Sequence, residues 1–162
     1  MRVDNQTGIG NLCEVARHIL NTMPVNAATK FAVRTVLREA VNKSNPEYKG
    51  NNNRKNCRHA SACAVALLGD AQAALVSDHA IPLSLLLEEV YDRPGIMLEE
   101  LVGLVGKYSV MVLITKAEDA RLAQAGLKKK MPGGWDGQDA LARYRHVGIE
   151  LRTNPLFQPI GC

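Results

Sequence analysis

The sequence predicts a single α+β domain over residues 1–162, mostly helical, with a small sheet of two or three strands and an N-terminal helical hairpin. The length is that of one domain able to bury its own core. Apolar residues recur at helical spacing through most of the chain, which favours helices. The run SVMVLIT at 109–115 is apolar and β-branched, which is typical of a central strand.

The N-terminal part is expected to be helical up to a polar loop. Residues 11–22 and 26–43 each place apolar side chains along one face, and the turn between these two helices falls at Met23–Pro24. Asn11 is the expected N-cap of the first helix. Residues 44–56 are rich in Asn, Lys and Arg and contain Pro and Gly, which predicts a flexible basic loop.

The α+β core is expected over residues 57–153. Residues 57–69 are rich in alanine and end at a glycine, which predicts a helix. The run 72–77 is typical of a short strand. Pro82 suits the first turn of a helix that ends before Pro94–Gly95. The heptapeptide strand at 109–115 is preceded by a helix at 97–108, which Gly103 and Gly106 weaken.

The second half of the core begins with a capping box. Thr115 and Glu118 stand three residues apart, directly ahead of a helix that runs to Gly126. A loop containing the only tryptophan follows. The chain then ends with a helix at 139–148, a strand at 149–153 and an irregular tail at 154–162.

Two titratable residues, Asp78 and His79, stand where the strand at 72–77 is expected to end. A histidine can act as a general base near neutral pH, and a carboxylate can hold a divalent ion against a scissile phosphate. The alternative is structural. In that case Asp78 caps the helix that begins near Pro82, and His79 is hydrogen-bonded in the core.

The stretch SDHAIPLS, residues 77–84, resembles the first strand of the HNH, or ββα-metal, endonucleases. In that family an Asp-His pair precedes one or two apolar residues, a proline and a further apolar residue. The resemblance implies Asp78 as a ligand of Mg²⁺ or Mn²⁺ and His79 as the general base. The family's downstream asparagine is missing, because no asparagine occurs between Asn56 and Asn154.

A second strand and helix of such a site would be VMVLITKAEDARLA, residues 110–123. Glu118 or Asp119 would then stand where the family has its second metal ligand, and a carboxylate can coordinate a hard cation. His146 is the next histidine along the chain and a further candidate ligand. Equally, the capping box accounts for Glu118, and the helix dipole accounts for Asp119.

The formal net charge is +4 and the pI is about 9.0, which permits nucleic acid or acidic proteins as partners. Aromatic residues are only 4% of the chain, which argues against a stacking platform for single-stranded nucleic acid. Basic side chains gather in the loop-like stretches 42–59 and 126–135 and near residue 144. They are explained either as solvated surface or as phosphate contacts. The candidate residues for binding nucleic acid or a partner are Arg54, Lys55, Arg58, Lys128, Lys129, Lys130, Trp135, Arg143 and Arg145.

The cysteines and the hydropathy pattern bear on metal and location. Cys57 and Cys63 stand six residues apart, a spacing that does not favour a structural zinc site even with His59 between them. No run of about 18 apolar residues occurs, so no membrane segment is expected. A cytoplasmic, reducing location with free thiols is therefore the expectation.

Two functions of different classes follow from these patterns. The first is a nucleic-acid-interacting protein with an HNH-like, metal-dependent nuclease corner that is either active or degenerate. The alternative is a non-enzymatic inhibitor or regulator of the mobile-element type, which binds a protein or nucleoprotein partner through its basic loops.

Overall fold

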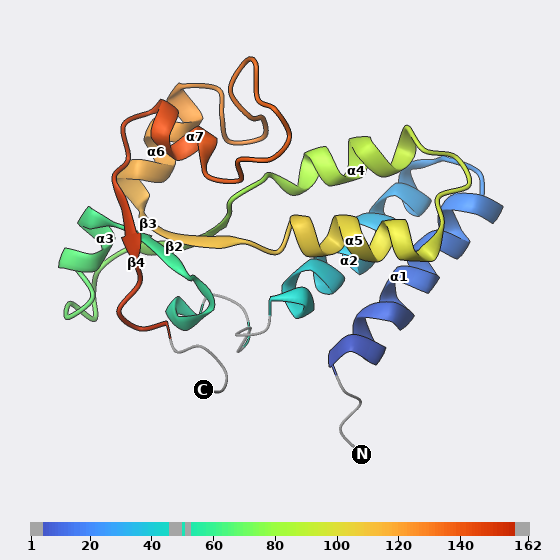
Figure 1. The fold of residues 1–162 in the computed structure, drawn as a ribbon, viewed down its shortest axis with the longest axis horizontal. Coiled ribbons are helices and arrows are strands. Elements are labelled where there is room, and N and C mark those ends of the chain that lie inside the picture. The colour runs from blue at the N-terminus through green and yellow to red at the C-terminus, as the bar shows by residue number, and fades with distance from the viewer. Residues whose placement is uncertain (1–4, 46–49, 51–52, 158–162) are drawn as a thin grey trace. The chain divides into compact units, whose positions relative to one another are not determined.

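A computed structural model describes residues 5–45, 50 and 53–157 of the chain (Figure 1). The chain divides into two compact units, each built from two separate stretches. The helical unit comprises Met1–Pro46 and Leu83–Ser109, and the sheet unit comprises Glu47–Pro82 and Val110–Cys162. The predicted class, α+β with a small sheet, is confirmed. The prediction of one domain over 1–162 stays a prediction.

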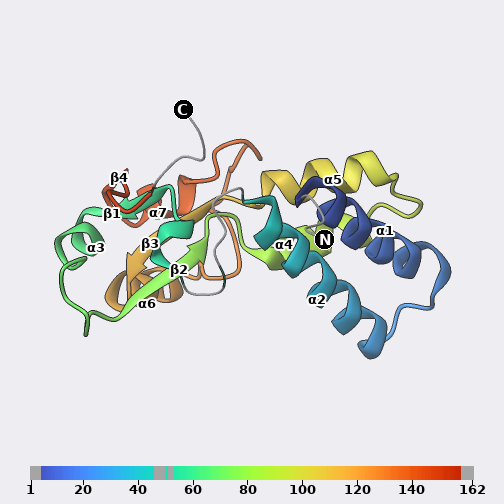
Figure 2. The same ribbon diagram turned by 90° about the horizontal axis from the view of Figure 1, so that it is seen from below.

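The helical unit contains α1 (Asn5–Thr22), α2 (Ala27–Ser44), α4 (Leu83–Tyr91) and α5 (Leu98–Lys107). The first two helices pack against each other as the predicted hairpin, and α5 packs against both of them (Figure 2). The buried apolar side chains along these helices include Cys13, Ala16, Val33, Leu37, Leu86, Val90, Leu101 and Val105. Within the described residues, no helix is both long and apolar enough to span a membrane.

The start of the first helix differs from the prediction. Asn11 lies inside α1 and does not cap it, because the helix continues back to Asn5 through two glycines. Glycine costs a helix about 1 kcal/mol relative to alanine. Burial of an amphipathic face outweighs such a propensity. The start of α2, by contrast, is set locally: the Asn26 side chain accepts hydrogen bonds from the backbone N–H groups of Ala28 and Thr29, at 2.9 and 3.0 Å.

The sheet unit is built on a four-stranded mixed sheet in the order β2-β3-β1-β4. The strands are β1 (His59–Ser61), β2 (Leu75–His79), β3 (Met111–Thr115) and β4 (Leu151–Thr153). β3 is parallel to β1 and antiparallel to β2, and β4 is antiparallel to β1. All five residues of β3 are buried, which confirms it as the central strand. The residues between β2 and β3 form α4 and α5, so a helical segment is inserted into a β-hairpin.

Three helices cover the two faces of this sheet: α3 (Ala62–Ala66), α6 (Lys116–Gln124) and α7 (Ala142–His146). On one face, Val112 and Ile114 of β3 pack with Leu122 of α6 and Tyr144 of α7. On the other face, Met111 and Leu113 of β3 pack with Ala64 of α3 and with Cys57. The alternation along β3 therefore separates two apolar clusters.

The segment predicted as one helix at 57–69 is instead strand β1 followed by the short helix α3. β1 pairs with β3 on one side and β4 on the other, so non-local strand pairing overrides the helix propensity of its alanines. Residues 46–49 and 51–52 of the predicted basic loop, and 158–162 of the tail, lie outside the described residues. The described end of that loop, Arg54–Asn56, is a 3₁₀ turn.

The predicted capping box at the start of α6 is confirmed and reaches further than the sequence indicates. The Glu118 carboxylate accepts hydrogen bonds from the backbone N–H and the hydroxyl of Thr115, at 2.9 and 3.0 Å. The same carboxylate oxygen accepts a 2.6 Å hydrogen bond from the Ser61 hydroxyl. Ser61 in turn caps α3 by accepting from the Ala64 backbone N–H at 3.0 Å. One buried carboxylate thus joins the starts of two helices.

Replacing Glu118 with alanine is expected to destabilise the protein by about 2–4 kcal/mol, because three buried donors lose their acceptor. Urea unfolding followed by circular dichroism measures this change. Asp119→Ala is the matched control on the same helical turn and should cost less than about 1 kcal/mol, since the Asp119 carboxylate is only half-buried and its partner Lys128 is exposed. Equal, small effects for the two variants would contradict the role given to Glu118.

Candidate functional site

The Asp78–His79 pair occupies the last two positions of β2, and so lies within the sheet and not beyond it. Asp78 is the cross-strand partner of Val112, which belongs to the cluster under α6 and α7. His79 is the partner of Met111, which belongs to the cluster on the α3 side. Because consecutive side chains of a strand face opposite sides of its sheet, the two side chains point to different faces.

The environment of Asp78 is dominated by one buried guanidinium, that of Arg143, which is only 1% exposed. Its Nε donates a 2.9 Å hydrogen bond to the carbonyl of Ala80, and its Nη1 donates a 3.0 Å hydrogen bond to the carbonyl of Leu127. Its Nη2 donates to the Asp78 carboxylate and to the backbone carbonyl of His79. The arginine thus binds the end of β2 and the segment after α6 together.

Tyr144 completes this cluster from the next position of α7. Its hydroxyl donates a 2.8 Å hydrogen bond to the same oxygen of Asp78 that Arg143 binds. The Arg143 guanidinium also lies 4.9 Å from the centre of the Tyr144 ring, a cation–π distance. We call Asp78, Arg143 and Tyr144 the arginine corner. The carboxylate does not cap α4, so the capping alternative for Asp78 was wrong.

Within the arginine corner, the negative charge of Asp78 is balanced by the positive charge of Arg143. Burial raises the pKa of the Asp78 carboxyl, while the positive charge of Arg143 and the hydrogen bond from Tyr144 oppose that rise. Burial, reinforced by the charge of Asp78, raises the pKa of the Tyr144 hydroxyl well above its ordinary value. The cation that accompanies Asp78 is therefore a protein side chain, the guanidinium of Arg143.

The other predicted metal ligands are separated by their own partners. Glu118 is the capping carboxylate described above, and Asp119 forms a 2.6 Å ion pair with Lys128. His146 is exposed at the end of α7. Asp119 is near enough to Asp78 for its charge to raise the pKa of that carboxyl, but Lys128 and Arg143 neutralise the pair. Across the described residues, no group of three His, Cys, Asp or Glu side chains could hold a metal ion; the metal-ligand assignment stays a prediction.

The described cysteines are free, as expected, and they differ in burial. Cys57 is buried, and burial raises the pKa of its thiol to about 11, whereas Cys63 is exposed. Burial and the charge of Arg58 lower the pKa of His59, which lies between them in the sequence. A buried protonated thiol is a poor metal ligand. The third described cysteine, Cys13, belongs to the helical unit and is also buried with a pKa raised to about 11.

The residues predicted to bind nucleic acid or a partner fall into two groups. Arg143 is in the core, and Arg54 is half-buried with its guanidinium bonded to the carbonyl of Ala73 at 3.1 Å. Trp135 is also half-buried, and its indole N–H donates a 2.8 Å hydrogen bond to the carbonyl of Asp139, which anchors its loop. The exposed group consists of Lys55, Arg58, Lys128, Lys129, Lys130 and Arg145.

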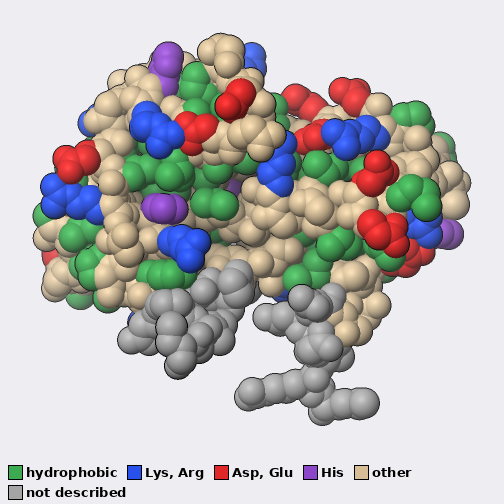
Figure 3. Space-filling view, in the orientation of Figure 1, with side chains coloured by type: hydrophobic (Ala, Val, Ile, Leu, Met, Phe, Trp, Pro, Cys, Tyr) green, Lys and Arg blue, Asp and Glu red, His purple; other side chains and the backbone are tan. Residues whose placement is uncertain are grey.

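The positive charge is unevenly divided between the two units. The sheet unit has 12 Lys and Arg residues against 8 Asp and Glu, and so carries the whole formal net charge of +4. The helical unit has 8 of each and is neutral. On the face shown in Figure 3, basic side chains are separated by neutral surface and do not form one continuous patch.

Tyr144 was not among the predicted site residues, and Arg143 was assigned to the contact surface. Asp78 and Arg143 are 65 residues apart, so no periodic pattern connects them. The one local signal is the sequence ARYRH itself. Residues two apart on a helix lie on nearly opposite sides, so Arg143 and Arg145 cannot both face solvent when one side of the helix is buried. Comparisons of the chain with known protein families, with curated proteins and with solved structures found no match.

Replacing Arg143 with methionine is expected to destabilise the protein by about 3–5 kcal/mol, because it leaves a carboxylate without its cation inside the sheet unit. Urea unfolding at pH 7 measures the loss. Arg145→Met, two residues along on the exposed side of α7, is the control and should cost less than about 1 kcal/mol.

The pH dependence of the same variant identifies the group responsible. Without Arg143, the folded-state pKa of Asp78 rises further above its unfolded value of about 3.9. A group whose pKa is raised on folding contributes stability that is present below the unfolded pKa and is lost as pH rises through the folded pKa. The deficit of Arg143→Met relative to the wild type should therefore shrink towards pH 4. A deficit that stays constant with pH would contradict this explanation. If Arg143→Met causes no deficit when Asp78 is replaced by Asn, the explanation is supported.

Proposed function

We propose that this chain is a non-catalytic nucleic-acid-binding protein that contacts the phosphate backbone through the exposed basic loops of its sheet unit. The observation that carries the proposal is the charge division, which puts the whole net charge of +4 on the sheet unit. Such a bias favours polyanions through counterion release. In this proposal the HNH-like stretch has become a structural support.

The arginine corner supports this role through its contact with Leu127. The Leu127 side chain is buried, its N–H is bonded to the carbonyl of Leu122 at 2.8 Å, and its carbonyl accepts from Arg143. Gly126, with a φ of 72°, makes the turn that ends α6. The three lysines 128–130 follow immediately and are exposed. The lysine segment, residues 128–130, therefore begins directly after a residue that is held in place by these contacts.

The kind of contact follows from the side chains that are exposed. Lysines act as point charges towards phosphate, without base selectivity. The one tryptophan is anchored to its own loop, and few other aromatic residues exist to stack on bases. Sequence-independent binding with a strong salt dependence is the expected behaviour.

Binding to a fluorescent DNA duplex and to an RNA of the same length, measured by anisotropy over a range of salt concentrations, tests the proposal. Lys129→Glu/Lys130→Glu should weaken binding and reduce the slope of log K against log salt by about 2, since each duplex phosphate contact contributes about 0.9. This pair leaves the Lys128–Asp119 ion pair intact. The control is Arg38→Glu/Lys43→Glu, with the same charge change on α2 of the helical unit.

Three results would count against this proposal. Absence of binding to DNA and RNA at low salt would overturn it and leave the inhibitor or regulator hypothesis, in which the basic loops engage a protein. Equal weakening by the control would mean that net charge, and not the lysine segment, determines binding. Unchanged binding in the Lys129/Lys130 variant would remove the segment from the interface.

The non-catalytic part of the proposal has its own test, which is incubation of supercoiled plasmid with the protein and Mg²⁺ or Mn²⁺. We expect no cleavage, because Asp78 and His79 face different sides of the sheet. We also expect His79→Ala to bind nucleic acid like the wild type, because His79 lies in β2 and outside the exposed basic loops. Metal-dependent cleavage that His79→Ala abolishes would replace this proposal with an active nuclease.

A further inference from the structure

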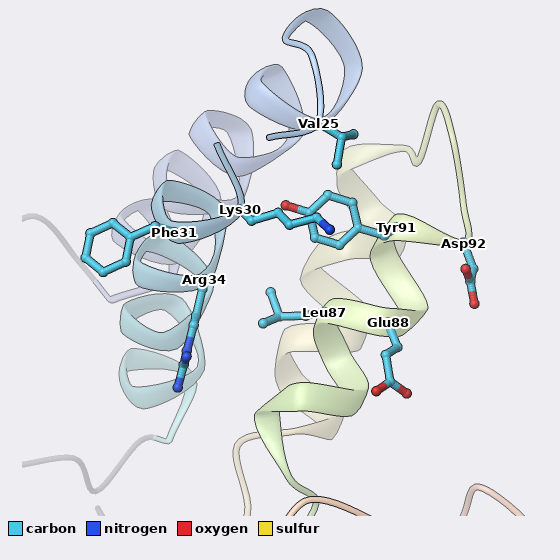
Figure 4. Close-up of a pocket in the computed structure, with 8 residues that line it drawn as sticks. All are labelled: Val25, Lys30, Phe31, Arg34, Leu87, Glu88, Tyr91 and Asp92. Atoms are coloured by element: carbon cyan, nitrogen blue, oxygen red, sulfur yellow. The ribbon is translucent and has the colours of Figure 1, made fainter. Parts of the chain in front are cut away.

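The helical unit contains a groove of about 760 Å³ between α2 and α4 (Figure 4). The eight residues that line it belong to α2 and the turn before it on one side, and to α4 and its end on the other. They are Val25, Lys30, Phe31, Arg34, Leu87, Glu88, Tyr91 and Asp92. None of them belongs to the sheet unit or to the basic loops discussed above.

The two sides of the groove carry opposite charges. Lys30 and Arg34 lie on α2, and Glu88 and Asp92 lie on the α4 side, as Figure 4 shows. All four side chains are exposed, and no ion pair joins any of them to another of the described side chains. Lys30 instead places its ammonium 5.9 Å from the centre of the Tyr91 ring.

Apolar side chains accompany these charges. Phe31 is 72% exposed and Val25 is 62% exposed, the two most exposed large hydrophobic residues among those described. Leu87 and Tyr91 extend the apolar surface into the groove, and the Tyr91 hydroxyl is buried without a hydrogen-bond partner among the described residues. An exposed apolar patch rimmed by charge is typical of a protein interaction site.

We propose that this groove is the interface of a homodimer, in which α2 of each copy faces α4 of the other. The charges that line the groove favour a second copy of the chain over other partners. A polyanion would meet Glu88 and Asp92, and a partner of either single sign would be repelled by one side of the groove. The occupant must carry a basic row and an acidic row flanking apolar residues.

A second copy meets this requirement with the same surface. A two-fold axis pairs identical patches, so a patch must be complementary to itself. Here the axis brings Lys30 and Arg34 of one copy against Glu88 and Asp92 of the other, twice in each dimer. The helical unit has equal numbers of basic and acidic residues, so net repulsion between two such units is absent. The inference is independent of nucleic-acid binding, which uses the other unit.

Sedimentation equilibrium of the full chain, with two charge-reversed variants, tests the dimer. Lys30→Glu/Arg34→Glu makes the groove wholly acidic, and Glu88→Lys/Asp92→Lys makes it wholly basic. Wild type should be dimeric, and each variant alone should dissociate at least about tenfold more readily, since like charges then face each other. An equimolar mixture of the two variants should form heterodimers, and the fourfold variant that combines all changes should again form a homodimer.

Controls separate dimerisation from folding. Glu99→Lys, an exposed reversal on α5 outside the groove, should leave the dimer unchanged. Far-ultraviolet circular dichroism and thermal melts establish that each variant is folded. Phe31→Ser is the further variant should a double reversal not fold, because so exposed a residue tolerates replacement in the monomer; it should weaken the dimer.

Several results would overturn the proposal. One is a wild-type chain that sediments as a monomer at every concentration up to its solubility. Another is folded charge-reversed variants that remain dimeric. A third is a mixture of the two variants that stays monomeric, because the pairing of α2 with α4 of the other copy requires the heterodimer to form.

Discussion

The structure of the sheet unit depends on the burial of one guanidinium. Arg143 binds the carbonyls of His79, Ala80 and Leu127 and the carboxylate of Asp78. An arginine in an apolar interior is tolerated only when its charge is paired and its N–H groups are bonded. The acceptors come from the end of an edge strand and from the segment after α6, two regions that strand pairing does not join. The same contacts satisfy three carbonyls at the points where regular structure ends.

This constraint changes the meaning of the catalytic-looking stretch. In SDHAIPLS, an aspartate and a histidine stand side by side, a pair that can bind a metal ion and activate water. In a strand, however, adjacent residues face opposite sides, and Asp78 is engaged by Arg143 and Tyr144. A carboxylate engaged in this way stabilises the sheet unit and holds its partners in position. The lysines 128–130, which follow Leu127 in the chain, are exposed. The arginine corner fixes the position of Leu127, where the chain continues after α6.

The parts of the fold that were predicted correctly from the sequence are those determined by interactions between residues close together in the chain. The Thr115–Glu118 box, the apolar β-branched run of β3 and the amphipathic face of α2 are each decided by residues within a few positions of one another. β1 was mistaken for helix because its three residues are specified by β3 and β4, far along the chain. Arg143 was mistaken for a surface cation for the same reason: its acceptors lie 16 to 65 residues away along the chain. Glu118 combines a local and a distant interaction. Its capping of α6 could be predicted from the sequence, whereas the hydrogen bond from Ser61, 57 residues away, could not.

The division of charge underlies the different roles that we propose for the two units. A neutral unit with rows of unpaired opposite charges is suited to pairing with itself, whereas a basic unit is suited to a polyanion. These properties reinforce each other, because a dimer holds two basic units on one assembly whatever the arrangement of the units within each chain. When one basic unit binds a nucleic acid, the second acts at a raised effective concentration, and the salt dependence of the two adds. In the proposed dimer, modest exposed charge on each sheet unit would then suffice for tighter binding than one unit alone provides.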